Sequence, residues 1–219
     1  MLSRVLEPEV MDDRDEAVEY NDMDHSEVNR NFVTDLIAAG PLGIDCLDMG
    51  TGTALIPIEL CLRLEDVRVM AADASPIMLD LARYRLEVNS LISRIQLHLG
   101  DAKKLVFEDR FFDTVMSNSL VHHLPSHESF LGEALRILRS GGLLFIRDLC
   151  RPTSHQQLES LVATHAANES VSSQQMLRQS LHAALCLDEI KSLAVDAGLP
   201  ADCVSMSSDR HWTLSARKQ

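Results

Sequence analysis

Long hydrophobic runs are missing from this sequence of 219 residues. The most apolar stretch, 54–62, is interrupted by Pro57 and Glu59, whereas a helix that spans a bilayer needs about 20 consecutive apolar residues. The opening MLSRVLEPEV also lacks the apolar core of a secretory signal. We therefore expect a cytoplasmic protein with no membrane span.

The sequence also lacks paired cysteines, and its overall composition is ordinary. The five cysteines form no C-x-x-C pair, and their odd number argues against a disulfide framework. Hydrophobic residues make up 46% of the chain and charged residues 24%, proportions that exclude disordered and fibrous classes. The length favours one compact domain with a sizeable core.

Positive charge is scarce, because 33 acidic residues stand against 20 basic ones and give a net charge of −13. Residues 1–30 hold ten of the acids and only three arginines. We expect residues 1–40 to form an acidic arm followed by a helix, and residues 41–219 to form the main domain. An acidic chain repels a phosphate backbone, so we expect no nucleic-acid partner.

Short apolar runs alternate with helical segments along the chain. Strands are expected at 44–49, 67–72, 95–99, 112–118 and 143–148, and helices at 26–39, 54–64, 75–89, 130–138 and 187–197. The helix at 130–138 is expected to be closed by Gly141 and Gly142. The runs VRVMAA and LLFI lack polar alternation, which is typical of strands buried on both faces. The pattern predicts an α/β protein with a doubly wound parallel sheet and helices on both faces.

The alternation changes after Asp148. The segment that follows is rich in Ser, Gln and His and carries apolar residues at helical spacing, which predicts a helical insertion at about 151–186. It leaves the sheet at the edge where open α/β sheets bind ligands, so we expect a lid there. Two last strands are expected at 202–207 and 212–216, and the short connection between them predicts an antiparallel pair.

A glycine turn, GTGTA at 50–54, follows the first strand IDCLDMG. The turn between the first strand and the first helix is where doubly wound sheets bind nucleotides. A dinucleotide fingerprint would need a third glycine where this chain has Leu55, and the Gly-Lys-Ser/Thr of a phosphate loop is missing. The turn therefore favours a nucleoside ligand that is not a polyphosphate.

Polar residues also stand at the ends of the next three strands. Asp73 closes the second strand, Asp101 follows the third, and Asn118 ends the fourth. The carboxyl ends of parallel strands meet at one edge of the sheet, so these residues and Asp48 should lie together. A carboxylate at the position of Asp73 can accept hydrogen bonds from both hydroxyls of a ribose.

These motifs resemble those of the class I S-adenosylmethionine-dependent methyltransferases over residues 44–216. The stretch LDMGTGTA matches their acidic-x-G-x-G motif, with Ala54 where many members carry a third glycine. The resemblance implies a Rossmann-like, mostly parallel seven-stranded sheet with an antiparallel last strand. It also implies S-adenosylmethionine as cofactor and S-adenosylhomocysteine as product. Within the superfamily the chain looks most similar to small-molecule methyltransferases of the ubiquinone/menaquinone-biosynthesis type.

The resemblance also assigns roles at the sheet edge. It implies that Gly50 and Gly52 admit the methionine part, that Asp73 holds the ribose, and that Asn118 lies near the sulfonium. Asp101 and Ala102 would face the adenine. Apart from the resemblance, Tyr20 in the acidic arm either covers the cofactor or is simply exposed. The expected cofactor-binding residues are Asp48, Gly50, Thr51, Gly52, Asp73, Ala74, Asp101, Ala102, Asn118 and Tyr20.

Three histidines follow the fourth strand: His122, His123 and His127. They have no carboxylate or cysteine partner at metal-ligand spacing, so we expect no metal site. Consecutive side chains point apart, and we expect His122 to face the cleft and His123 to serve as a structural hydrogen-bonding residue. His122 and Asp148 are the candidate catalytic residues, because either could remove a proton from the acceptor.

We expect an enzyme that methylates a small-molecule acceptor at oxygen, nitrogen or carbon. Residues 118–121 read NSLV rather than the Asn/Asp-Pro-Pro-aromatic motif, and no Pro-Cys dipeptide occurs, which argues against nucleic-acid methylation. A non-catalytic module that binds S-adenosylmethionine is the main alternative. A nicotinamide dehydrogenase is disfavoured by Leu55. The sequence leaves open whether the chain forms a homodimer.

Overall fold

The computed structural model describes residues 2–7 and 26–219 of the chain. Its strands are β1 (Asp45–Met49), β2 (Arg68–Asp73), β3 (Ile95–Leu99), β4 (Phe112–Asn118), β5 (Leu138–Leu149), β6 (Val204–Met206) and β7 (His211–Arg217). Its helices are α2 (Ser26–Ala38), α3 (Leu55–Arg63), α4 (Pro76–Val88), α5 (His127–Ile137), α6 (His155–His165), α7 (Val171–Ala183) and α8 (Leu187–Asp196), with short 3-10 helices η1 (Val121–His123) and η2 (Ala201–Cys203).

The strands form one seven-stranded sheet in the order β3-β2-β1-β4-β5-β7-β6. Strands β1 to β5 are parallel, and β7 lies antiparallel between β5 and β6. The predicted fold class and the antiparallel pairing of the last two strands are thereby confirmed. The chain runs outward from β1 to β3 and then returns to β4, so the strand order reverses between β1 and β4. Ligands bind at this reversal in open α/β sheets.

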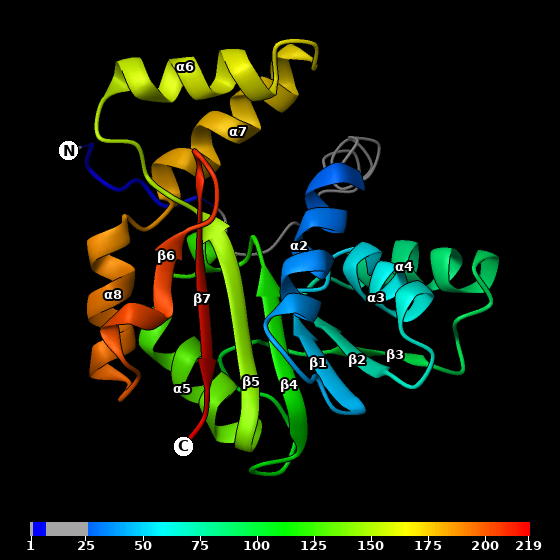
Figure 1. Ribbon diagram of the computed structural model, residues 1–219. Coiled ribbons are helices and arrows are strands. Elements are labelled where there is room, and N and C mark those ends of the chain that lie inside the picture. Colours follow the sequence, from blue (N-terminus) through cyan, green and yellow to red (C-terminus); the bar gives the residue numbers. More distant parts are fainter. Residues whose placement is uncertain (1, 8–25) are drawn as a thin grey trace.

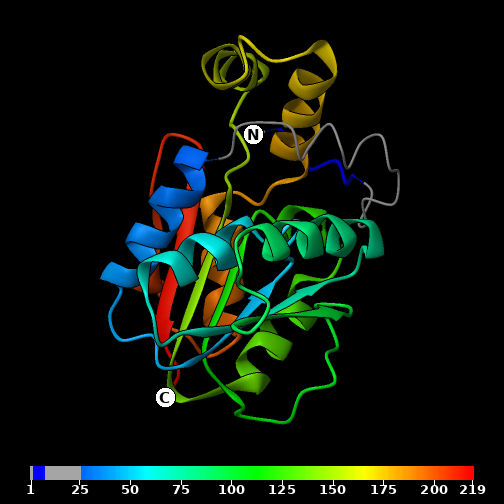
Figure 2. The same cartoon turned by 90° about the vertical axis from the view of Figure 1, so that its right-hand side faces the viewer.

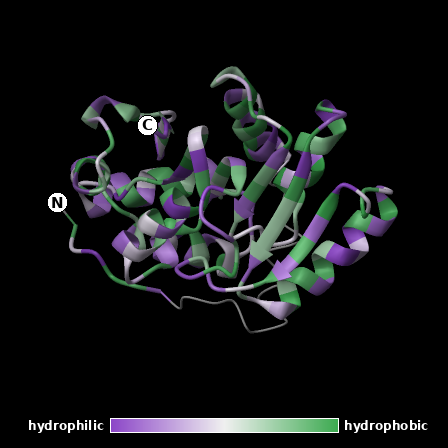
Figure 3. Cartoon of the chain, turned by 90° about the horizontal axis from the view of Figure 1, so that it is seen from below, coloured by the Kyte–Doolittle hydropathy of each residue, from purple (hydrophilic) through white to green (hydrophobic). Residues whose placement is uncertain are grey.

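Helices cover both faces of the sheet (Figures 1 and 2). Helices α2, α3 and α4 bury one core cluster, and α5 and α8 bury the other. Strand β1 shows why both faces are apolar: Cys46 belongs to the first cluster, whereas Leu47 and Met49 belong to the second. Along the outer helices hydrophobic and hydrophilic positions alternate in Figure 3, as expected for helices with one buried face.

One expected boundary was wrong. Residues 130–138 were expected to form a helix closed by a turn at Gly141 and Gly142, but α5 begins at His127 and the chain is already in β5 at Leu138. Two steps along β4 correspond to five along β5 between the pairs Phe112–Leu138 and Thr114–Leu143. Gly141, with a φ of 78°, takes up the extra residues as a bulge within the strand.

Helices α6 and α7 form the insertion and lie beyond the carboxyl ends of β4 and β5 (Figures 1 and 2). They build a third apolar cluster with Leu149 at the end of β5; its other buried members are Leu158, Leu161, Val162, Ala166, Leu181 and Ala184. The N-terminal segment, residues 2–7, lies against α7, where the N–H of Val5 donates to the carbonyl of His182 at 3.2 Å. None of the helices in the described ranges is long and apolar enough to cross a membrane.

Candidate functional site

The glycine turn at the end of β1 is held open toward the sheet edge. The N–H groups of Gly50 and Thr51 both donate to the carbonyl of Ala72 in β2 at 2.9 Å. Gly50 (φ 76°) lies so close to Leu120 that an added Cβ would be 2.8 Å from that side chain. Gly52 (φ 54°) differs, because an added Cβ would meet nothing within 4 Å. The space beside the Cα of Gly52 is therefore open to a ligand.

Asp73 joins the end of β2 to this turn. Its carboxylate accepts the N–H of Gly52 at 2.7 Å and the N–H of Ser75 at 2.9 Å. Burial raises the pKa of Asp73 despite these backbone hydrogen bonds. A carboxylate has room for about four hydrogen bonds, so the side chain can serve the turn and still accept from a ligand.

The other expected edge residues differ in their surroundings. Asp48 is buried beneath the turn, and this burial raises the pKa of its carboxyl to about 7. Ala74 and Asp101 are exposed, and Asp101 forms a 3.0 Å ion pair with Lys103. Ala102 is half-buried. Tyr20 lies outside the described residues.

Two buried polar atoms at this edge can serve a ligand: Asn118 Oδ1, which has no partner among the described residues, and Thr51 Oγ1, which lies beside the Asp48 carboxyl. The amide nitrogen of Asn118 donates to Ser119 Oγ at 3.2 Å, so its oxygen is left to accept from something else. Buried polar atoms are normally paired. Together with the open backbone at Gly52 and the carboxylate of Asp73, these atoms fit an adenosyl ligand laid across the edge.

The second part of the site lies beyond β4 and β5. His122, in η1, is buried, and its Nδ1 lies 2.5 Å from Oδ1 of Asp148. Asp148 is 1% exposed and His122 is 3% exposed. A carboxylate on Nδ1 orients the ring and directs Nε2 away from β5.

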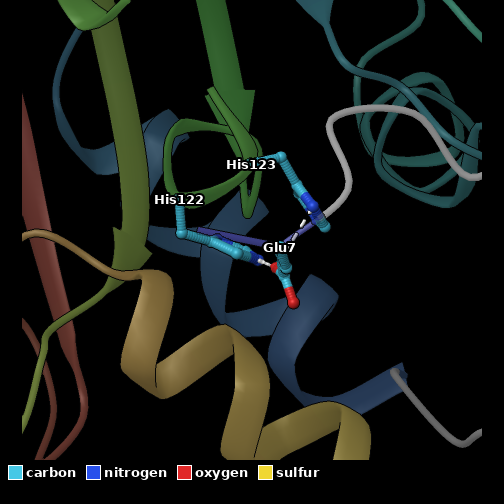
Figure 4. A group of neighbouring side chains, drawn as sticks. All are labelled: Glu7, His122 and His123. Carbon is cyan, nitrogen blue, oxygen red and sulfur yellow. Dashed lines mark ion pairs between the residues drawn. The ribbon is translucent and has the colours of Figure 1, made fainter. Parts of the chain in front are cut away.

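Glu7 meets the other side of His122 (Figure 4). Its Oε1 lies 3.2 Å from His122 Nε2 and 3.1 Å from His123 Nδ1. The expectation that the two histidines point apart was wrong, because their ring centroids are 4.2 Å apart and both rings face one carboxylate. Residues 121–123 form a 3-10 helix with three residues per turn, in which consecutive side chains diverge by about 120° rather than 180°.

The electrostatics of this group follow from its two carboxylates. Burial alone would lower the pKa of His122, but the charge of Asp148 and hydrogen bonds with Asp148 and Glu7 raise it to about 10. Burial would raise the pKa of Glu7, and the two histidines outweigh this effect and lower it. The two carboxylates thus favour the protonated form of His122.

Glu7, His122 and His123 also bring one potential metal-ligand atom each within 4.8 Å of one another. The sequence argument against a metal rested on the missing carboxylate, and Glu7 supplies one from a segment more than a hundred residues away. No feature of the sequence pointed to Glu7. The expectation of a metal-free site stays a prediction, which chelation can test.

Comparison with known proteins adds a family and a fold. Residues 47–146 match the family model described as a methyltransferase domain. The chain is 31% identical over 112 residues to the demethylmenaquinone methyltransferase of Desulfitobacterium hafniense, covering 51% of this chain and 44% of that protein. It is 28% identical over 175 residues to the 27-O-demethylrifamycin SV methyltransferase of Amycolatopsis mediterranei, covering 78% and 61%. The chain thus spans about half the length of the curated relatives it matches.

A solved structure shows the same fold over nearly the whole chain. The SAM-dependent methyltransferase from Aquifex aeolicus superposes with a TM-score of 0.71 at 17% identity, covering 94% of this chain and 98% of that one. At this identity the match concerns the fold. The resemblance seen in the stretch LDMGTGTA is confirmed by these matches, since the stretch falls in the segment that matches the family model.

Proposed function

We propose that the chain is a class I S-adenosylmethionine-dependent methyltransferase that transfers the methyl group of S-adenosylmethionine to a small-molecule acceptor, supported by the matching methyltransferase-domain model and relatives. One observation carries this proposal. The open backbone at Gly52 and the His122–Asp148 pair lie at the same carboxyl edge of the sheet. A methyl donor held by the first would face an acceptor held by the second.

The cofactor would be held by the edge residues. In this proposal Asp73 accepts from the ribose hydroxyls, Asn118 Oδ1 and Thr51 Oγ1 pair with polar atoms of the ligand, and the backbone of Gly52 admits the methionine part. Asp101 and Ala102 would border the adenine, with Asp48 and Ala74 supporting the turn and the strand end. Tyr20 is proposed to cover the cofactor on its sequence position alone.

The acceptor would lie under α6 and α7. A cavity of about 400 Å³ opens between these helices and the N-terminal segment; it is lined by Val5, Leu6, Glu7, His155, Leu158, Glu159, Gln175, Arg178, Gln179 and His182. A volume of this size suits a small molecule rather than a polynucleotide. The relatives named for demethylmenaquinone and a demethylrifamycin support the same class of acceptor.

Bound S-adenosylmethionine supplies an activated methyl carbon, so the protein mainly orients the partners and excludes water. The acceptor's electron pair forms the new bond to the methyl carbon while the carbon–sulfur pair returns to sulfur. His122, directed by Asp148, would hold the acceptor oxygen through Nε2. For an acceptor that enters with a proton on that oxygen, His122 would first pass its Nε2 proton to Glu7, which would leave as the carboxylic acid, and the neutral Nε2 would then take the proton of the acceptor.

The proposed location and partner class rest on the cysteines and the net charge. All five cysteines are free thiols, which supports a reducing compartment such as the cytoplasm. The net charge of −13 supports a partner other than nucleic acid. Size-exclusion chromatography would decide between a monomer and a homodimer.

The proposal is tested by calorimetry and by label transfer. S-adenosylmethionine and S-adenosylhomocysteine should each bind and raise the melting temperature. Methyl label from S-adenosylmethionine should then pass into the low-molecular-weight fraction of a cell extract. Binding without transfer would support the non-catalytic alternative, and the absence of binding would refute the proposed function.

A further inference from the structure

The carboxylate of Glu7 lies in a group of donors that come from two separate parts of the chain. His122 and His123 face its Oε1 at 3.2 and 3.1 Å (Figure 4). The hydroxyl of Ser180 in α7 lies 3.2 Å from Oε1 and 3.3 Å from Oε2 and donates to the carboxylate. The Glu7 side chain is only 11% exposed. The protein thus buries an anion at this point and surrounds it with donors.

The donors around Glu7 favour a negatively charged partner. His122 is buried with its Nδ1 against Asp148, and a buried ring nitrogen is costly unless a hydrogen-bond partner satisfies it. Nε2 of His122 faces Oε1 of Glu7, which can accept a charge-assisted hydrogen bond from it. Arg4, which donates to the carbonyls of His122 and Leu124 at 3.2 Å, adds a further positive group nearby.

Glu7 is carried by a segment with little hold on the rest of the molecule. Arg4 Nε donates to the carbonyl of Ala183 at 2.6 Å, and Leu2 packs against the third apolar cluster. Val5 and Leu6 are 57% and 53% exposed. A segment that buries so little apolar surface opens at a small cost in free energy. The donors belong to η1 and α7, which pack against each other.

The donor group also lies where an acceptor would need to bind. Leu120, two residues before His122, packs against Gly50 of the glycine turn. On the other side, Glu7 lines the cavity beneath α6 and α7. Glu7 therefore borders both this cavity and the two histidines, which themselves do not line the cavity.

We propose that Glu7 occupies the subsite for an anionic oxygen of the acceptor, and that the acceptor is a small carboxylate or ionised hydroxyl compound which displaces Glu7 from His122, His123 and Ser180. The inference rests on the proposed function for the role of the molecule as acceptor. The anion subsite itself is defined by the side chains alone. Removing Glu7 removes an internal competitor, and the apparent affinity for an outside anion rises by the inverse of the fraction of time that the site is free.

The test uses benzoate as an anionic probe and benzamide as its neutral analogue. Binding of each is measured by calorimetry to the full chain, to Glu7→Ala and to Glu7→Gln, with Glu169→Ala as a control that removes one exposed negative charge from the α6–α7 connection. We expect Glu7→Ala to bind benzoate at least about tenfold more tightly than the parent. Benzamide should gain no affinity, and Glu169→Ala should match the parent. Adding His123→Ala to Glu7→Ala should abolish the gain.

The proposal is overturned if benzoate binds Glu7→Ala no better than the parent, if benzamide gains as much as benzoate, or if the gain survives His123→Ala. It is also overturned if the gain disappears in chelator, because a metal would then hold the anion. Glu7→Gln keeps the shape of the side chain and covers the case in which Glu7→Ala is unstable. S-adenosylmethionine affinity is measured on the same samples, so a failure of the proposed function is seen separately from a failure of the anion subsite.

Discussion

His122 and Asp148 are joined twice, although 26 residues separate them. The ring Nδ1 lies 2.5 Å from Oδ1 of Asp148, and the backbone N–H of His122 donates to Oδ2 at 3.1 Å. Both carboxylate oxygens are thus used to fix one residue, ring and backbone together. Since Asp148 ends β5 and His122 follows β4, the neighbouring parallel strands bring them together at the edge. The contact between His122 and Asp148 therefore depends on the order of the strands in the sheet.

Asp148→Asn should flatten the pH dependence of stability in the alkaline range. The pKa of His122 is raised to about 10 by Asp148 and Glu7, against burial, whereas an unfolded histidine titrates near about 6.5. Between these values the folded state binds more protons than the unfolded state, so stability is fully present below the lower value and falls as pH rises toward the upper one. Urea unfolding from pH 6 to 10 measures this slope.

Asp209→Asn is the matched control for that experiment. Asp209 pairs with His165 at 2.7 Å, but it is 54% exposed, and exposed pairs contribute little to stability. The slope of the control should equal that of the parent. A parent and an Asp148→Asn variant with the same alkaline slope would contradict the assigned pKa of His122.

Asp73→Ala should weaken the binding of S-adenosylmethionine by about 1–3 kcal/mol, because it leaves ribose hydroxyls without an acceptor in a partly buried site. Asp101→Ala is the comparison. Asp101 is exposed and paired with Lys103, so its loss should cost less. Titration calorimetry decides, and equal affinities for the parent and Asp73→Ala would remove Asp73 from the cofactor site.

Gly52→Ala should abolish cofactor binding while the fold persists. Gly52 and Gly198 both have positive φ, of 54° and 82°, and an added Cβ would meet nothing within 4 Å at either place. Alanine in the left-handed region costs about 1–2 kcal/mol at each position, so the two variants should melt at similar temperatures. Gly198 follows α8, far from the site, and Gly198→Ala should bind S-adenosylmethionine like the parent. Unimpaired binding by Gly52→Ala would show that the ligand does not use the open space at this turn.

Activity, once an acceptor is found, should survive chelation. The three potential ligand atoms of Glu7, His122 and His123 are already engaged with one another, and the proton on His122 Nε2 would have to leave before a metal could bind. Rates in EDTA, and after adding back magnesium or zinc, are the measurement. Loss of activity in EDTA, with recovery when zinc is added back, would show that the cluster is a metal site.

The parts of the molecule that the sequence predicts are those governed by local patterns. Apolar runs placed β1, β2 and β4 within a residue or two, and the strand ends placed Asp48, Asp73 and Asn118 at one edge because parallel strands share a direction. Gly141 and Gly142 signalled a turn, but the partner strand β4 keeps residues 138–142 in the sheet. That outcome depends on tertiary pairing, which a local window does not contain.

Glu7 could not be predicted for a related reason. It lies in a run of acidic residues that reads as a solvated surface, and its partners follow more than a hundred positions later. The convergence of both histidines on it depends on η1 being a 3-10 helix. His122 and Asp148 could be predicted as candidates from their places after strands, whereas their direct contact required the order of β4 and β5.

The last prediction concerns the cavity beneath α6 and α7. Gln179 on α7 lines this cavity of about 400 Å³ and is exposed, so Gln179→Trp would fill part of it without disturbing the buried cluster of the two helices. If the acceptor binds there, the variant should lower label transfer about tenfold or more, through a loss of acceptor binding. Its affinity for S-adenosylmethionine should match the parent, because the glycine turn is untouched. Gln156→Trp is the control: Gln156 is exposed on α6 but does not line the cavity, so the same substitution should leave transfer unchanged. Equal transfer by the two tryptophan variants would place the acceptor elsewhere and leave α6 and α7 as a peripheral pair of helices.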